Sequence, residues 1–143
     1  MKKLLITILV AILTLSLIAC GEKSEGKKNT SSGPKYAFES ANCDNIDPYT
    51  YPEDYPLIAG DDFEASFKKM EDANMKGEIK TYQDVVAIYE SEGVYFENCD
   101  KESNGVQYKY YGWFSDSNGF VLITFKADKD NLEYFAYTGW DSN

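Results

Sequence analysis

The chain has 143 residues, with 24 aspartates and glutamates against 14 lysines, a net charge of −10 and no histidine. Without histidine, neither a Ser-His-Asp nor a Cys-His catalytic arrangement can form, and histidine-based metal sites are also excluded. The negative charge disfavours nucleic acid, whose phosphates repel an acidic protein. We therefore expect no nucleic-acid partner and no cofactor.

Residues 1–19 have the pattern of an export signal. Lys2 and Lys3 precede an apolar stretch, residues 4–19, that ends in a small residue. At about 1.5 Å per residue, this stretch would form a helix roughly 24 Å long. The hydrocarbon core of a membrane is about 30 Å thick, so the stretch is short for a permanent span. We predict a cleaved signal peptide, with an uncleaved membrane anchor as the alternative.

The signal closes with Leu17-Ile18-Ala19-Cys20, which resembles the lipobox of bacterial lipoproteins. The resemblance implies a diacylglyceryl group on the Cys20 sulfur and cleavage of the chain just before Cys20. A two-chain lipid anchors a protein durably, whereas a single acyl chain holds it only marginally. The expected location is the outer face of the cell membrane, with the lipid as the contact to the bilayer.

The next two segments predict a tether and a lead-in. Residues 20–35 are rich in Lys, Ser, Gly and Asn and contain no large apolar side chain, so we expect a flexible tether. Residues 36–60 hold three of the four prolines, which predicts an extended lead-in strapped over the domain. Residues 61–143 then form the folded domain. Residues 36–143 carry 22 acidic residues and 8 lysines, a net charge of −14.

Three cysteines are present, and the lipobox assigns Cys20 to the lipid. Cys43 and Cys99 then remain as a pair outside the cell, where disulfides persist. We predict a disulfide between them that holds the lead-in to the domain. Two free thiols are the alternative.

Two helices are expected at the start of the domain. Asp61 and Glu64 have the spacing of a helix start, and three apolar residues follow on one face: Phe63, Phe67 and Met70. Thr81 and Asp84 have the same spacing at the start of a second helix, which Gly93 would end. The inner face of this second helix would carry Val85, Ile88 and Tyr89.

Strands are predicted after Gly93. Apolar and aromatic runs at residues 94–98, 106–114, 120–127 and 132–137 are separated by polar turns, of which DKESNG is the first. This pattern is typical of an antiparallel meander. The predicted fold class is α+β, with two N-terminal helices packed on a four-stranded antiparallel meander sheet in two layers.

The turns predict which residues share a face. A two-residue turn at Asn118-Gly119 would place Trp113 opposite Thr124, and a second at Lys129-Asp130 would place Lys126 opposite Glu133. The face toward the helices would then carry Val121, Ile123, Phe125, Leu132 and Tyr134. The other face would carry Lys109 and Thr124 together with six candidate binding residues: Tyr111, Trp113, Leu122, Lys126, Phe135 and Tyr137.

Aromatic side chains on a water-facing sheet surface are typical of protein-binding sites. These six residues are therefore the predicted partner-binding surface. Two alternatives are open: the lead-in covers the surface, or a register slip of one residue turns the rings inward.

Four segments resemble the β-lactamase-inhibitor-protein-like lipoprotein domains of Gram-positive bacteria: DFEASFKKMEDANM, KTYQDVVAIYESEG, YKYYGWF and VLITFKADKDNLEYFAYTGW. The matching residues are Thr81-Tyr82-Gln83-Asp84-Val85-Val86, Trp113, Thr124-Phe125 and Asp128. The resemblance implies a helix pair on a four-stranded sheet with a concave open face. In the inhibitor relatives that face grips another protein. The inhibitor has two tandem repeats, and this chain has one.

The predicted function is a lipid-anchored, non-catalytic, monomeric module that binds an envelope or secreted protein through the aromatic sheet face. One alternative is an accessory lipoprotein with a structural or assembly role in the envelope. A small hydrolase of wall polymer is less favoured, because a chain with this many carboxylates always offers some pair of them. We do not expect an enzyme.

Overall fold

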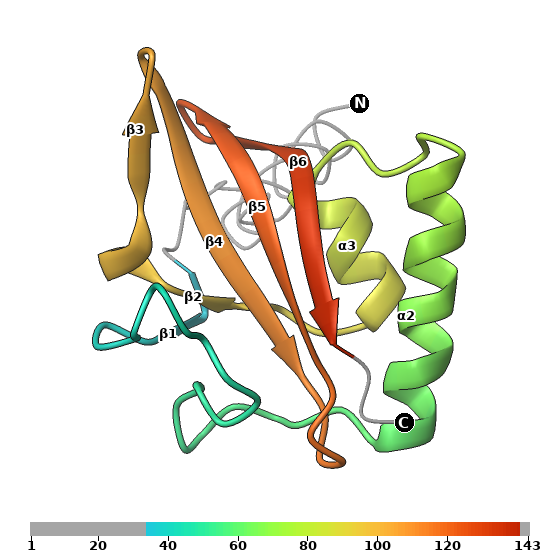
Figure 1. Cartoon of the computed structure of the whole chain (residues 1–143). Helices are drawn as coiled ribbons and strands as arrows, with labels where there is room; N and C mark the ends of the chain where they lie inside the picture. The colour runs from blue at the N-terminus through green and yellow to red at the C-terminus, as the bar shows by residue number, and fades with distance from the viewer. Residues whose placement is uncertain (1–33, 141–143) are drawn as a thin grey trace, which may run out of the picture. The chain divides into compact units, whose positions relative to one another are not determined.

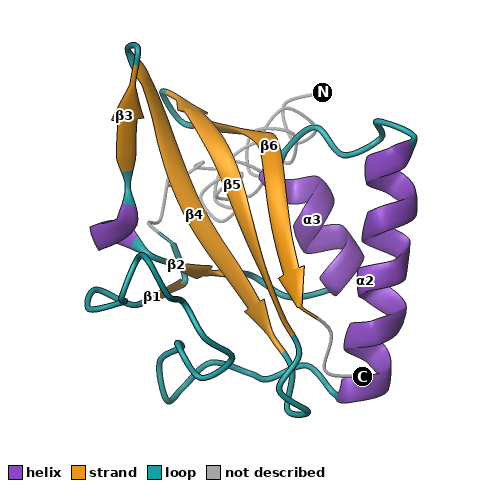
Figure 2. Cartoon of the chain, in the orientation of Figure 1, coloured by secondary structure: helices purple, strands orange, loops and turns teal. Residues whose placement is uncertain are grey.

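In the computed structural model, residues 34–140 are described, and within them two α-helices lie on one side of a six-stranded sheet (Figures 1 and 2). The signal peptide, Cys20 and all but the last two residues of the tether lie outside the described residues. No helix within residues 34–140 has the length and apolar character needed to cross a membrane.

The helices are α2 (Gly60–Met75) and α3 (Tyr82–Tyr89). The strands are β1 (Tyr36–Ala37), β2 (Val94–Tyr95), β3 (Lys101–Ser103), β4 (Val106–Phe114), β5 (Phe120–Asp128) and β6 (Asn131–Trp140), with a short 3-10 helix, η1 (Glu97–Cys99), between β2 and β3. Their order in the sheet is β1-β2-β4-β5-β6, and β3 also pairs with β4. The three long strands lie side by side in Figure 1, and β6 forms one edge.

The α+β class is confirmed, but the prediction of a four-stranded antiparallel meander is wrong. The sheet is mixed, because β1 from the lead-in pairs parallel with β2. The expected turn DKESNG contains a strand, since β3 pairs antiparallel with β4 and turns at Asn104 and Gly105, both with positive φ. Both extra strands are too short, and β3 too exposed, to show a hydrophobic alternation in the sequence.

The two helix starts differ in how their N–H groups are satisfied. The Thr81–Asp84 capping box of α3 is confirmed. The expected cap at Asp61 is wrong: α2 begins at Gly60, whose N–H donates to Oδ1 of Asp116 on the β4–β5 hairpin at 2.9 Å. α3 ends at Tyr89 rather than near Gly93, because Glu90 takes a left-handed conformation.

Replacing the carboxylate of the α3 cap gives a pH-dependent prediction. The pKa of Asp84 is lowered from 3.8, chiefly because the carboxylate accepts the N–H of Lys80 and also that of Thr81, both at 2.9 Å. Asp84→Ala should lower the free energy of unfolding by about 1 kcal/mol at neutral pH. The folded wild type binds fewer protons here than the unfolded chain, so the stabilisation is lost as the pH falls below 3.8 through the lowered pKa.

Urea unfolding of wild type and Asp84→Ala across a pH series measures this difference. Asp84→Asn is the matched control, because it keeps an acceptor without a charge and should lose less stability, with no titration. If the difference in the free energy of unfolding between wild type and Asp84→Ala stays constant down to pH 2, the carboxylate does not have the capping role assigned to it.

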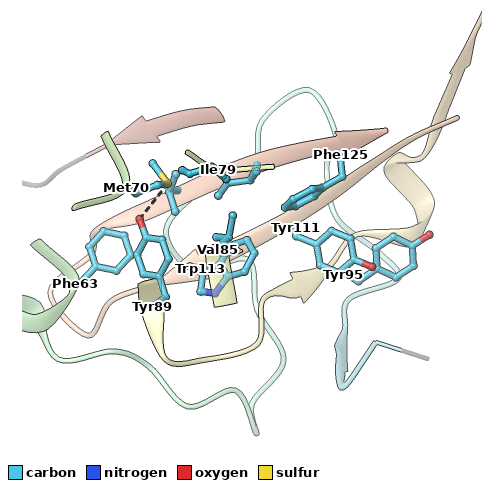
Figure 3. Packing of buried hydrophobic residues seen from close by; sticks show 11 residues of the cluster. Phe63, Met70, Ile79, Val85, Tyr89, Tyr95, Tyr111, Trp113 and Phe125 are labelled. Atoms are coloured by element: carbon cyan, nitrogen blue, oxygen red, sulfur yellow. Dashed lines mark hydrogen bonds between the residues drawn. The ribbon is translucent and has the colours of Figure 1, made fainter. Parts of the chain in front are cut away.

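The main core lies between the helices and the sheet. Phe63 and Met70 of α2 and Val85 and Tyr89 of α3 are buried against β4 and β5 (Figure 3). The sheet contributes Tyr111, Trp113, Val121, Ile123 and Phe125. The predicted apolar stripes of both helices and the predicted inner face of β5 are confirmed.

A second core lies on the opposite side of the sheet, under the lead-in. Ala41 and Tyr55 are buried against Val94, Phe96 and Phe114. The disulfide between Cys43 and Cys99, 56 positions apart, is confirmed, and Cys99 is part of this core. The lead-in therefore covers part of the outer face of the sheet, which is the face turned away from the helices.

Candidate functional site

The β4–β5 hairpin decides which way the predicted binding residues point. Phe114 pairs with Phe120 and Trp113 with Val121, so residues 115–119 form a five-residue loop in place of the expected two-residue turn. The Ser115 N–H donates to the Gly119 carbonyl at 2.8 Å and closes this loop. Trp113 was expected opposite Thr124, three residues further along. A register shift by an odd number of residues moves every side chain of β4 to the other face of the sheet.

Tyr111 and Trp113 therefore point toward the helices, with 6% and 0% of their surfaces exposed. The Trp113 indole N–H donates to the Ser91 carbonyl at 2.8 Å, and its ring stacks on Tyr89. Burial raises the pKa of Tyr111 to about 12. The predicted outward orientation is wrong for both residues.

Tyr137 is also turned inward, for a different reason. Lys126 pairs with Glu133 as predicted, but β6 has a bulge at Phe135, opposite Thr124 and Phe125 of β5, which shifts its register by one residue. Tyr137 then lies opposite Ile123 on the helix side, not opposite Leu122. Its hydroxyl donates to Oε1 of Glu71 on α2 at 3.1 Å. Burial and this carboxylate raise the pKa of Tyr137.

The other three predicted residues do lie on the outer face. Leu122 is half-buried and packs against the second core under the lead-in. Lys126 and Phe135 lie beyond the lead-in, and Phe135 is 51% exposed. The Lys126 Nζ lies 4.8 Å from the centroid of the Phe135 ring, a cation–π contact.

One residue of this surface was missed from the sequence. Tyr108 pairs with Lys126 across the β4–β5 ladder, and its ring centroid lies 5.3 Å from that of Phe135 in an edge-on contact. We call Tyr108, Lys126 and Phe135 the outer patch. The correct hairpin register would have brought Tyr108 into the prediction, because it places the even-numbered residues of β4 on this face.

An open pocket lies at the far end of the same face. It has a volume of about 440 Å³ and lies between the lead-in and the β4–β5 hairpin, lined by Asn45, Ile46, Asp47, Pro48, Tyr49, Asn118 and Phe120. The Asp47 carboxylate fixes the lead-in turn, because the N–H of Tyr49 and the hydroxyl of Thr50 both donate to Oδ1 at 2.9 Å. Phe120 and Lys126 are six residues apart on β5, which separates the pocket from the outer patch by about 20 Å.

A third cluster combines Tyr95, Asp100 and Lys109 at the end of the sheet near β3. The Tyr95 hydroxyl donates to Oδ2 of Asp100 at 2.5 Å and accepts from Lys109 Nζ at 2.9 Å. Burial and the Asp100 carboxylate raise the pKa of Tyr95, so the phenol stays protonated and is a poor general base. The cluster joins β2 to β4 and closes the main core.

Metal chemistry receives no support from the described part of the chain. Within residues 34–140, no three or more side chains of Cys, Asp or Glu are grouped so that they could hold a metal ion. The outer patch offers two aromatic rings and a lysine ammonium group.

Comparisons with known proteins did not identify a relative of this chain. A scan against protein-family models, a search of curated proteins and a search of solved structures each found no match. The resemblance to the β-lactamase-inhibitor-protein-like domains therefore stays a prediction.

Proposed function

We propose that this protein is a lipid-anchored binding module of the cell envelope that holds another protein through the outer patch. The observation that carries the proposal is Phe135, a half-exposed aromatic ring in contact with Lys126 and Tyr108 on a part of the sheet that the lead-in leaves open. Aromatic side chains provide much of the energy in protein interfaces, whereas most exposed residues contribute little. The chain thus keeps a costly apolar group in water where a partner can cover it.

Two sequence features support the location in the proposal. The export signal and the lipobox-like residues 17–20 support a lipid on Cys20, and the polar tether of residues 20–35 would hold the domain away from the bilayer. The charge of residues 36–143 also opposes close contact with anionic lipid headgroups. An outward-facing patch on such a domain is accessible to envelope and secreted proteins.

Site-specific photo-crosslinking in intact cells tests the proposal. A photo-reactive phenylalanine analogue in place of Phe135 should crosslink to one defined protein, and Lys126→Glu in the same chain should reduce the yield by about tenfold, the equivalent of roughly 1.4 kcal/mol. The matched control places the same analogue at Gln83, an exposed position of α3 on the opposite side of the sheet. The proposal would be contradicted if the analogue gave the same crosslinked products at Gln83 as at Phe135, or if it gave no crosslink at Phe135.

A further inference from the structure

β6 is an edge strand, and only the first half of its free edge is covered. Thr81 forms an antiparallel bridge with Glu133, and the Tyr134 N–H donates to the Lys80 carbonyl at 2.8 Å. From Ala136 onward, no bridge and no main-chain hydrogen bond joins this edge to another segment within the described residues. Figure 1 shows β6 at the edge of the sheet, on the side where α3 and α2 lie.

The alternation of an antiparallel ladder identifies the unpaired groups. Successive residues point their N–H and C=O groups alternately toward and away from the neighbouring strand. Tyr134, which pairs with Phe125, points away, as its bond to Lys80 requires. Tyr137 and Gly139 pair with Ile123 and Val121, of the same parity as Phe125, so their N–H and C=O groups also point away from β5.

At Gly139 the main chain of this edge is open to solvent. Ala136, Thr138 and Gly139 are all exposed, and the exposed surface of a glycine belongs to the main chain. A Cβ atom at Gly139 would lie 2.3 Å from the Phe67 ring, so glycine lets α2 pack closely beneath an edge that stays free. Residues 136–139, AYTG, contain neither charge nor proline, the usual means of blocking an open edge.

We infer that the free edge of β6 at residues 136–139 accepts an extended segment of another protein as an added strand, with lysine or arginine at alternate positions. The inference rests on the proposed function, because the segment would belong to the protein that the outer patch holds. Tyr137 and Gly139 offer the main-chain donors and acceptors for the pairing. Alternate side chains of the added strand would lie toward α2 and toward the outer face.

Charge selects a basic strand over a second copy of this chain. On the α2 side, an added side chain would lie near Glu71, whose Oε1 is 3.1 Å from the Tyr137 hydroxyl. The acidic residues of α2 outnumber its lysines: Asp61, Asp62, Glu64, Glu71 and Asp72 against Lys68 and Lys69. Pairing of two copies through β6 would bring two such helices together, and their like charges would repel. A basic segment meets attraction instead.

Amide hydrogen exchange of the full chain, followed by NMR, tests the inference with the heptapeptide Lys-Val-Lys-Val-Lys-Val-Lys. At ten times its Kd, the peptide should slow exchange of the Tyr137 and Gly139 amides about tenfold. The Thr138 amide, already paired with Leu122, should change little. The same peptide with glutamate for lysine should give no protection. Two further peptides carry N-methyl groups on alternate residues, one on the odd-numbered and the other on the even-numbered residues. Only the peptide whose methyl groups point away from β6 should bind, because the other has lost the N–H groups that pair with β6.

The possible results separate the inference from the proposed function. Absence of protection at Tyr137 and Gly139 overturns the inference, including the case in which the peptide perturbs only the outer patch, where the proposed function would stand. Protection of both amides without peptide, together with a doubled particle mass, would identify a second copy as the occupant and also overturn it. Protection by the lysine peptide, in a protein that gives no crosslink from Phe135 in intact cells, would support the edge and contradict the outer patch.

Discussion

Trp113→Ala should lower the free energy of unfolding by about 3–5 kcal/mol, the range expected for truncating a large buried aromatic side chain. Trp113 is completely buried, and its ring packs between Tyr82 and Tyr89 of α3. The substitution also leaves the Ser91 carbonyl without the indole N–H that it accepts. Small domains are stable by only about 5–15 kcal/mol, so this loss is a large part of the total.

Urea unfolding monitored by circular dichroism measures the change, and Phe135→Ala is the matched control. Phe135 is also an aromatic residue of the sheet but is half-exposed on the outer face, so its truncation should cost less than about 1 kcal/mol. The sequence-based orientation put both residues on the outer face and therefore predicts a small loss of stability for Trp113→Ala as well. A loss below 1 kcal/mol for Trp113→Ala would restore that orientation and contradict the packing of the main core.

The two hairpins of the long strands show how far the sequence could predict the register of the sheet. Lys129-Asp130 is exposed and makes only local contacts, so turn chemistry alone predicts the Lys126–Glu133 pair correctly. The β4–β5 loop also contains an Asn-Gly pair, but its Asp116 satisfies the Gly60 N–H at the start of α2. This contact joins residues 56 positions apart, and no local turn rule includes it. The longer loop reverses the faces of β4.

The bulge in β6 has a similar cause. Strict alternation from Leu132 and Tyr134 would put Ala136 on the helix side and Tyr137 on the outer face. In the structure both tyrosines reach α2, because the Tyr134 hydroxyl donates to Asn74 at 2.9 Å and the Tyr137 hydroxyl to Glu71. One extra residue, Phe135, is needed to turn both rings to the same side. Helix periodicity and strand positions are local properties and were predictable, whereas this contact depends on the docking of α2.

Removal of the disulfide should lower the free energy of unfolding by an amount similar to that of Trp113→Ala. The Cys43–Cys99 bond closes a long loop, and the loop-closure model gives about 4 kcal/mol for a loop of this length. We expect Cys43→Ala with Cys99→Ala to lower the free energy of unfolding by about 2–5 kcal/mol. Without the bond, the lead-in is still held by the β1–β2 pairing, by the apolar contacts of the second core and by the Asn98 side-chain amide, which donates to the Ala41 carbonyl at 2.8 Å.

The position of the bond predicts where the variant opens first. Phe114 and Phe96 are fully buried beneath the lead-in, so its release would expose apolar surface on the outer face of the sheet. Limited proteolysis should cut the double variant within residues 36–56 well before the helices, while the wild type resists at the same protease concentration. Wild type treated with a dithiol reductant is the matched control and should give the same early cuts. Cleavage that begins in α2 or α3 would instead mean that the lead-in stays docked without the bond, and that the second core alone holds it in place.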